Sequence, residues 1–134
     1  MSFRIEQKIP MTFNDSQEFL DNLRLEGIEQ LYPRRIINSK YFDTIGFSMY
    51  RDSEEGLLPR KKIRIRNYPL SSKNIHSLEI KVSSIEGRYK TTEKISKQEL
   101  KSIYKNGYYD SVYGPIEKKV SVEYSREYYL FKGI

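Results

Sequence analysis

Residues 61–66 read Lys-Lys-Ile-Arg-Ile-Arg, and this stretch decides the fold because cationic and apolar side chains alternate along it. Successive side chains of a β-strand point to opposite faces. A strand here therefore places Lys62, Arg64 and Arg66 on one face and the two isoleucines on the other. Like charges two residues apart on a strand face are roughly 6–7 Å apart. Each such pair costs about half a kcal/mol in water, so this face favours an anionic partner.

Two later stretches repeat the alternation. The side chains that share a charged face are Glu79 and Lys81 in the stretch at 78–82, and Arg88, Lys90 and Lys94 in the stretch at 88–94. If neighbouring strands align these faces, one surface of a sheet carries a dense field of positive charge. Phosphate suits such a surface, because arginine offers a planar fork for two oxygens and lysine a compact point charge. A carboxylate in this field, such as Glu79 or Glu6, would pair with a cation, orient an arginine or hold a divalent metal.

Periodicity and capping signals predict the remaining elements. Strands are expected at 3–9, 34–43, 76–83, 88–95 and about 118–126, and helices at about 16–27 and 97–105. Loops are expected at 54–59 and 106–117, and the state of 47–51 stays open. Asn14, Asp15 or Ser16 would cap the first helix, and Ser96 with Glu99 the second. The sum is an α+β fold of six or seven largely antiparallel strands with two short helices.

Composition points to one domain with a polyanionic partner. The chain has 134 residues, a net charge of +6 and a pI of about 9.4, and we expect a single domain over residues 1–134. It has no cysteine, and His76 is its only histidine, so a disulfide framework and a histidine metal cluster are excluded. No apolar run approaches the roughly 20 residues of a membrane-spanning helix. The first residues lack the apolar segment of a signal peptide, so we expect a cytoplasmic protein without a membrane span.

Six segments, taken in order, resemble one protein family. They are Ile-Glu-Gln-Lys at 5–8, Ser-Lys-Tyr-Phe-Asp-Thr at 39–44, Lys-Ile-Arg-Ile-Arg-Asn-Tyr at 62–68, Leu-Glu-Ile-Lys at 78–81, Tyr-Lys at 89–90 and Val-Glu-Tyr-Ser-Arg-Glu at 122–127. No segment is specific alone. Their order and spacing together resemble the polyphosphate polymerase (VTC) domain, which belongs to the CYTH-like triphosphate tunnel superfamily. The resemblance extends from Arg4 to about Tyr129.

This resemblance implies an antiparallel β-tunnel or half-barrel lined by Lys, Arg and Glu. Relatives bind ATP and polyphosphate there, and transfer the γ-phosphoryl group to the polyphosphate chain with a divalent metal, manganese or magnesium. The residues that resemble the family's phosphate contacts are Lys8, Arg64, Arg66, Lys81, Lys90, Tyr124 and Arg126. The strand phase adds Lys62 and Arg88 to the predicted phosphate-binding set. Glu6 and Glu79 are the candidates for a metal ligand.

The chain departs from this family pattern in two places. Thr91 and Thr92 follow Tyr89 and Lys90, where relatives often carry basic residues. Relatives also continue beyond the strand that contains Arg126, with another arginine strand, the glutamate that resembles the principal metal ligand, and lysines that close the tunnel. We therefore expect the chain to correspond to the N-terminal portion of such a domain. No catalytic residue can be assigned from its sequence. Three explanations stay open: a truncated or degenerate protein without activity, a second copy that completes the tunnel, or a separately encoded chain that does so.

Two alternatives stay open. A nucleic-acid-binding module would suit the positive charge and the twelve tyrosines. Such modules place aromatic residues beside the cations on one strand face, whereas the basic strand contains none, which makes nucleic acid the less favoured partner. A triphosphate hydrolase of the same superfamily would resemble a Glu-x-Glu-x-Lys signature near the start. Arg4, Glu6 and Lys8 stand there, so a base replaces the first acid.

Overall fold

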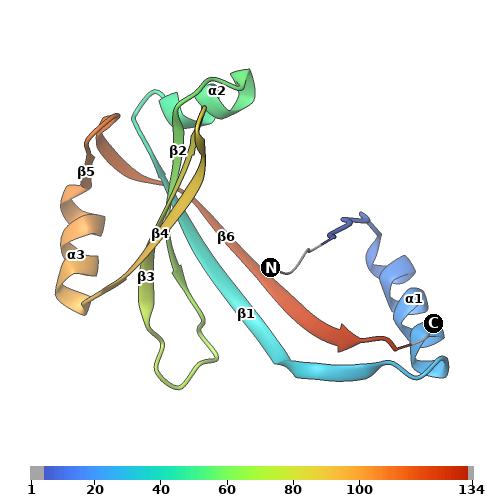
Figure 1. Cartoon of the computed structure of the whole chain (residues 1–134). Helices are drawn as coiled ribbons and strands as arrows, with labels where there is room; N and C mark the ends of the chain where they lie inside the picture. The colour runs from blue at the N-terminus through green and yellow to red at the C-terminus, as the bar shows by residue number, and fades with distance from the viewer. Residues whose placement is uncertain (1–4, 133–134) are drawn as a thin grey trace. The chain divides into compact units, whose positions relative to one another are not determined.

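The computed structural model of the chain describes residues 5–132. Within that range the elements are, in order, α1 (Phe13–Leu25), β1 (Glu29–Asp43), α2 (Ser48–Glu55), β2 (Arg60–Asn67), β3 (His76–Ser84), β4 (Gly87–Ile95), α3 (Lys97–Asn106), β5 (Tyr108–Asp110) and β6 (Gly114–Leu130) (Figure 1). The chain divides into two compact units. The first contains the described residues up to Arg34 and those from Glu127 on, and the second is Arg35–Arg126.

The first unit contains helix α1, which begins at Phe13 and not at residue 16 as the sequence predicted. Its cap is Thr12, whose hydroxyl accepts a hydrogen bond from the Asp15 amide at 3.1 Å, so the predicted caps at 14–16 are wrong. The strand predicted at 3–9 is also wrong where it is described, because residues 5–9 are exposed and without regular structure. Alternating side chains would give a strand here one apolar face. A strand also needs a neighbouring strand that hydrogen-bonds to its backbone N–H and C=O groups, and alternation does not provide one. Residues 3 and 4 lie outside the described range.

The strands form one sheet in the order β4-β3-β2-β1-β6-β5. β2 pairs antiparallel with β1 and β3, and β3 pairs antiparallel with β4. The charged stretches of the sequence therefore lie side by side, as predicted. The short strand β5 pairs antiparallel with the beginning of β6. The prediction of an α+β fold with an antiparallel half-barrel sheet is confirmed, with one helix more than the sequence predicted.

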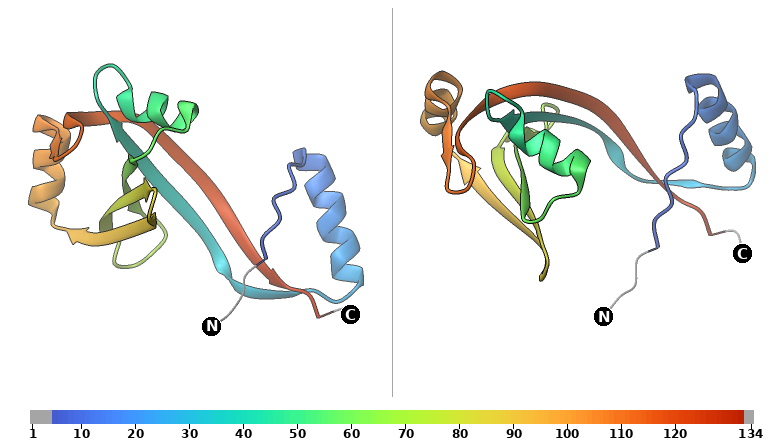
Figure 2. Two further views of the ribbon diagram at one scale, coloured as in Figure 1. Left: turned by 45° about the horizontal axis from the view of Figure 1, so that its top comes forward. Right: turned by 90° about the horizontal axis from the view of Figure 1, so that it is seen from above.

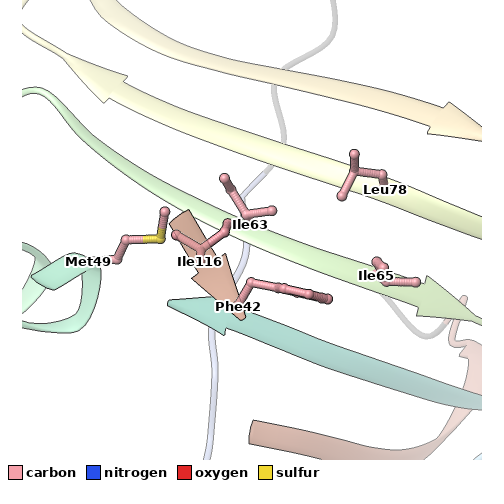
Figure 3. Close-up of a cluster of buried hydrophobic side chains, with 6 residues drawn as sticks. All are labelled: Phe42, Met49, Ile63, Ile65, Leu78 and Ile116. Carbon is pink, nitrogen blue, oxygen red and sulfur yellow. The ribbon is translucent and has the colours of Figure 1, made fainter. Parts of the chain in front are cut away.

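The isoleucines of β2 define the apolar face of the sheet in the second unit. Ile63 and Ile65 are each 1% exposed. The core cluster around them consists of Phe42, Met49, Ile63, Ile65, Leu78 and Ile116 (Figure 3). Burying one such side chain contributes about 1.5–3 kcal/mol. Because a slip of one residue would turn every side chain to the other face, this burial fixes the strand register and leaves the charged positions on the opposite face.

Helix α3 joins the two edge strands, β4 and β5, and its apolar side covers the core (Figures 1 and 2). Ser96 caps it by accepting an amide hydrogen bond from the first turn at 3.1 Å, as predicted. Leu100 and Ile103 pack against the core cluster. The Tyr104 ring stacks on Phe42, with ring centroids 6.4 Å apart. Helix α3 thus covers the apolar face of the sheet.

Helix α2 is absent from the sequence prediction, which leaves its first turn open and assigns its end to a loop. The residue directly before it is Phe47, which offers no capping side chain. The cap comes instead from Asp43 at the end of β1. Its carboxylate accepts hydrogen bonds from the backbone amides of Met49 at 2.9 Å and Tyr50 at 3.1 Å. The residue that caps this helix therefore lies at the end of β1, and a loop separates it from the helix. A search for a capping residue directly before the helix does not find it.

The loop predicted at 106–117 is wrong, because this segment forms β5 and the beginning of β6. Asp110 closes the turn between them by accepting hydrogen bonds from the backbone amides of Val112 and Tyr113, each at 3.0 Å. Gly114 adopts a φ of 76°, which suits a residue without a side chain. The turn residues were recognised correctly from the sequence, but they belong to a tight hairpin and not to a long loop.

Candidate functional site

Charged side chains occupy the face of β2, β3 and β4 opposite the isoleucines. The positions on this face are Arg60, Lys62, Arg64 and Arg66 on β2, Ser77, Glu79, Lys81 and Ser83 on β3, and Arg88, Lys90, Thr92 and Lys94 on β4. Glu79 is the single carboxylate among them. We call this surface the cationic face. Its charge follows directly from the strand phase that the sequence predicts.

Glu79 lies at the centre of the cationic face, with a side chain only 7% exposed. Arg64 donates a hydrogen bond from Nε to one carboxylate oxygen. Arg66 Nε lies 3.9 Å from the same oxygen, and Lys90 Nζ lies 3.4 Å from the other. Burial alone would raise the pKa of Glu79, but the hydrogen bond and charge of Arg64, with the charges of Arg66 and Lys90, outweigh burial and hold this pKa below its ordinary value.

Strand β1 supplies a second contact to each of these arginines. Arg64 Nη1 donates to the Tyr41 hydroxyl at 3.2 Å, and Arg66 Nε donates to the Ser39 hydroxyl at 3.2 Å. Burial would lower the pKa of Arg64, but its hydrogen bonds to Tyr41 and Glu79 raise it above the ordinary value. Both guanidinium groups are held between β1 and β3.

A row of lysines crosses the cationic face beside these arginines. Lys81 lies opposite Lys62 on one side and opposite Lys90 on the other. Like charges directly opposite on neighbouring strands are destabilising. Burial, and then the charges of Arg64 and Lys90, lower the pKa of Lys81 below its ordinary value. Within residues 5–132, neither Lys62 nor Lys81 forms an ion pair with a carboxylate. Lys62 and Lys81 thus carry positive charge that is not paired with a carboxylate of the described residues, whereas Lys90 contacts Glu79.

A groove of about 930 Å³ adjoins this row. From the cationic face and its neighbour β1 it is lined by Tyr41, Lys62, Arg64, Glu79 and Lys81, and from the segment around α2 by Phe47, Met49, Tyr50 and Arg51. Its volume lies within the range of about 300–1,000 Å³ that small-molecule sites commonly have. An anion of several phosphate groups would fit the groove and meet cations along one wall.

The structure brings together six of the predicted phosphate ligands. They are Lys62, Arg64, Arg66, Lys81, Arg88 and Lys90. Tyr124 and Arg126 lie on β6, which is separated from β2 by β1. They share a strand face, as predicted, since the Arg126 guanidinium lies 5.4 Å from the centre of the Tyr124 ring. Glu6 and Lys8 are exposed residues of the first unit, whereas the cationic face belongs to the second unit. That any of these residues binds phosphate stays a prediction.

Sequence reasoning missed three residues of this surface. Arg60 has the same strand phase as Lys62, so extending the basic strand by one alternation would have found it. Ser39 and Tyr41 stand in the Ser-Lys-Tyr-Phe-Asp-Thr segment, and their register opposite Arg66 and Arg64 explains their contacts. Only the pairing of β1 with β2 shows that these hydroxyl groups meet the arginines.

The described residues do not fit the expected divalent metal. No group of three or more His, Cys, Asp or Glu side chains lies close enough to hold a metal ion within residues 5–132. Glu79, the predicted ligand on the cationic face, instead faces Arg64, Arg66 and Lys90. Cations around a carboxylate oppose the approach of another cation. We therefore derive no chemical step through a metal at Glu79.

The antiparallel half-barrel with Lys, Arg and Glu on one face agrees with the fold that the resemblance to the VTC domain implies. The chain belongs to the VTC domain family, whose sequence model matches residues 1–131. Among solved structures it is similar to a provisionally assigned adenylate cyclase from Bacillus halodurans, with a TM-score of 0.59 and 15% identity, covering 92% of this chain and 71% of that chain. At this identity the likeness shows the fold alone. A search of curated proteins found no match.

The helices in the described part of the chain were also compared with the requirements of a membrane span. None of them is long and apolar enough to cross a bilayer.

Proposed function

We propose that this VTC domain binds triphosphate or polyphosphate on the cationic face, with the row Lys62, Lys81 and Lys90 and the arginines Arg64 and Arg66 as its phosphate contacts. The lysine row is the observation that carries the proposal. Its charges stand opposite one another across three strands and repel, so the free surface is unfavourable. A polyanion reduces this repulsion, because its phosphate oxygens bring negative charge to the ammonium groups of the row.

The family supports a more specific activity. VTC relatives transfer the γ-phosphoryl group of ATP to polyphosphate, and the proposal extends to this phosphotransferase reaction. Transfer of a phosphoryl group depends mainly on positioning and on neutralising the charge that spreads over its oxygens. The arginines and lysines of the cationic face would supply this neutralisation. The reaction also needs the metal that relatives use, and the described carboxylates do not form its site.

A nucleic-acid-binding module is the second candidate, and the cationic face disfavours it. On this face β2, β3 and β4 carry no aromatic side chain on which a base could stack, and Tyr41 of the neighbouring strand β1 lies beside Arg64. Tyr89 of β4 lies opposite Val82, on the apolar side of the sheet. Competition between tripolyphosphate and single-stranded DNA separates the candidates. If DNA displaced tripolyphosphate at equal phosphate concentration, the phosphate-specific proposal would be wrong.

Thermal unfolding with and without tripolyphosphate, and in parallel with ATP, tests the proposal at low salt. A ligand present at 100 times its dissociation constant stabilises the folded state by about 2.7 kcal/mol. We expect a clear rise in the unfolding temperature, and charge reversal at Arg64 and Arg66 should abolish it. The matched control reverses the charges of Lys97 and Lys101 on α3, which belongs to the opposite side of the sheet. No stabilisation of the unmodified chain at low salt would refute the proposal.

A further inference from the structure

We propose that Glu79 is a positioning residue of this phosphate site, which holds Arg64 and Arg66 so that their terminal amino groups point to the ligand; this inference rests on the proposed function. The Nε group of Arg64 donates a hydrogen bond to Glu79, whereas Arg66 Nε donates to Ser39 and lies 3.9 Å from the same Glu79 oxygen, an ion-pair distance. A guanidinium group has donors at Nε and at both Nη atoms. A contact through Nε leaves donors at the Nη atoms that can bind another acceptor.

The contacts from β1 complete this arrangement. Tyr41 accepts from Arg64 Nη1, and Ser39 accepts from Arg66 Nε. Within residues 5–132, Arg64 Nη2 and both Nη atoms of Arg66 make no hydrogen bond. The protein thus contacts Arg64 through Nε and Nη1 and Arg66 through Nε, and the remaining Nη groups are left for the ligand. Such unused donors suit the oxygens of a phosphate group.

Burial explains why the arginines need this support. The side chains of Arg64 and Arg66 are only 11% and 14% exposed, and both charges would lack an anion near them without Glu79. A long side chain that is fixed before the ligand arrives does not lose its rotational freedom on binding. Glu79 is itself held by the register, since it lies directly opposite Arg64 on the neighbouring strand. Its role is therefore to orient the arginines, although its negative charge opposes the ligand.

Two substitutions separate orientation from charge. Glu79→Gln removes the charge and keeps an oxygen that accepts from Arg64 Nε, whereas Glu79→Met removes both and keeps a similar size. If Glu79 orients the arginines, Glu79→Gln binds tripolyphosphate at least as tightly as the unmodified chain. Glu79→Met then binds about tenfold more weakly than Glu79→Gln, as expected for the loss of one hydrogen bond to a charged group. Equal affinities of the two variants would overturn the proposal.

The matched control is Glu93 on β4, an exposed carboxylate opposite Leu78 and therefore on the other side of the sheet. Glu93→Gln and Glu93→Met should bind tripolyphosphate equally well. Tyr41→Phe, which changes no charge, should weaken binding several-fold. Isothermal titration is carried out with a chelator and again with Mn²⁺. If Glu79→Gln weakens binding only in the presence of Mn²⁺, Glu79 is a metal ligand and the proposal is wrong.

A second measurement keeps the test decisive if Glu79→Met does not fold. The Nε–H proton of Arg64 should give a nuclear magnetic resonance signal in the unmodified chain. This proton should exchange slowly with water, because its hydrogen bond to Glu79 protects it. Exchange as fast as that of an exposed arginine would overturn the proposal. If the unmodified chain does not bind tripolyphosphate at all, the proposed function fails. If it binds and the two Glu79 variants agree, only the positioning role fails.

Discussion

Replacing Lys81 by methionine should stabilise the free protein and at the same time weaken phosphate binding. Lys81 lies between Lys62 and Lys90 on the cationic face. Burial and the charges of Arg64 and Lys90 lower the pKa of Lys81, so its charged form is less favourable in the folded chain than in the unfolded chain. Methionine keeps an unbranched apolar stem and removes the ammonium group. Opposite effects on stability and binding distinguish a ligand-binding cation from an ordinary surface lysine.

The magnitude follows from the strand geometry. Directly opposite side chains have Cβ atoms about 5 Å apart, and two unit charges about 6 Å apart in water repel by roughly 0.7 kcal/mol. The water dielectric applies because Lys81 is exposed, although partial burial contributes to its lowered pKa. Arg64 and Lys90 each contribute repulsion of this order, and attraction to Glu79 offsets part of it. A net gain of about 1 kcal/mol corresponds to a rise of roughly 2–5 °C in the unfolding temperature.

The pH dependence has a definite sign. Because the pKa of Lys81 is lowered, the cost of its charge is fully present below the folded-state pKa, and stability is gained as the pH rises through it towards the ordinary value of 10.5. The unfolding temperatures of the unmodified chain and of Lys81→Met should therefore converge as the pH approaches that value. At neutral pH the difference should be largest.

The assay is thermal unfolding without ligand and with tripolyphosphate. Lys81→Met should lose about tenfold in affinity, which reduces the ligand-induced stabilisation by about 1.4 kcal/mol. Lys101→Met provides the control, because Lys101 is exposed on α3 and should change neither quantity. If Lys81→Met destabilised the free chain, or left tripolyphosphate binding unchanged, the argument from charge repulsion would be refuted.

Three further predictions concern carboxylates and a tyrosine that hold the second unit together. Asp43→Ala removes the acceptor for the first turn of α2 and should cost about 1–2 kcal/mol in urea unfolding; an unchanged midpoint would contradict the capping role. Burial would raise the pKa of Asp110, but hydrogen bonds from Tyr113, Lys61 and Val112 lower it, so its stabilisation is present above its ordinary pKa of 3.8 and lost as the pH falls through the folded value. Asp110→Asn should therefore flatten the acid side of the stability profile, and a parallel shift of the whole profile would count against this assignment. Burial, and then the hydrogen bond to Asp52, raise the pKa of Tyr113 to about 12, so Tyr113→Phe should leave the ultraviolet titration of the tyrosines unchanged around pH 10 and remove a component near 12.

The charged strands show how far sequence reasoning reaches. Alternation in the basic stretch and in the Leu-Glu-Ile-Lys stretch predicted which side chains share a face, and the register confirms it. The strand predicted at 3–9 shows the same alternation, but its described residues are irregular. The difference is that Ile63 and Ile65 are buried by partners from other strands, whereas Ile5 is 100% exposed. Periodicity predicts which face a strand would bury. It does not predict whether other elements of the fold pack on that face.

By itself the sequence determined the class of fold, the membership of the cationic face and the kind of ligand that this charge favours, because these properties depend on alternation and composition within short segments. The tertiary structure alone decided which groups meet. It set Lys81 between two lysines, joined Glu79 to Arg64, Arg66 and Lys90, and brought Ser39 and Tyr41 to the arginines. These contacts depend on the register between strands distant in the sequence. That register is set by burial of the apolar face, which is a property of the assembled sheet.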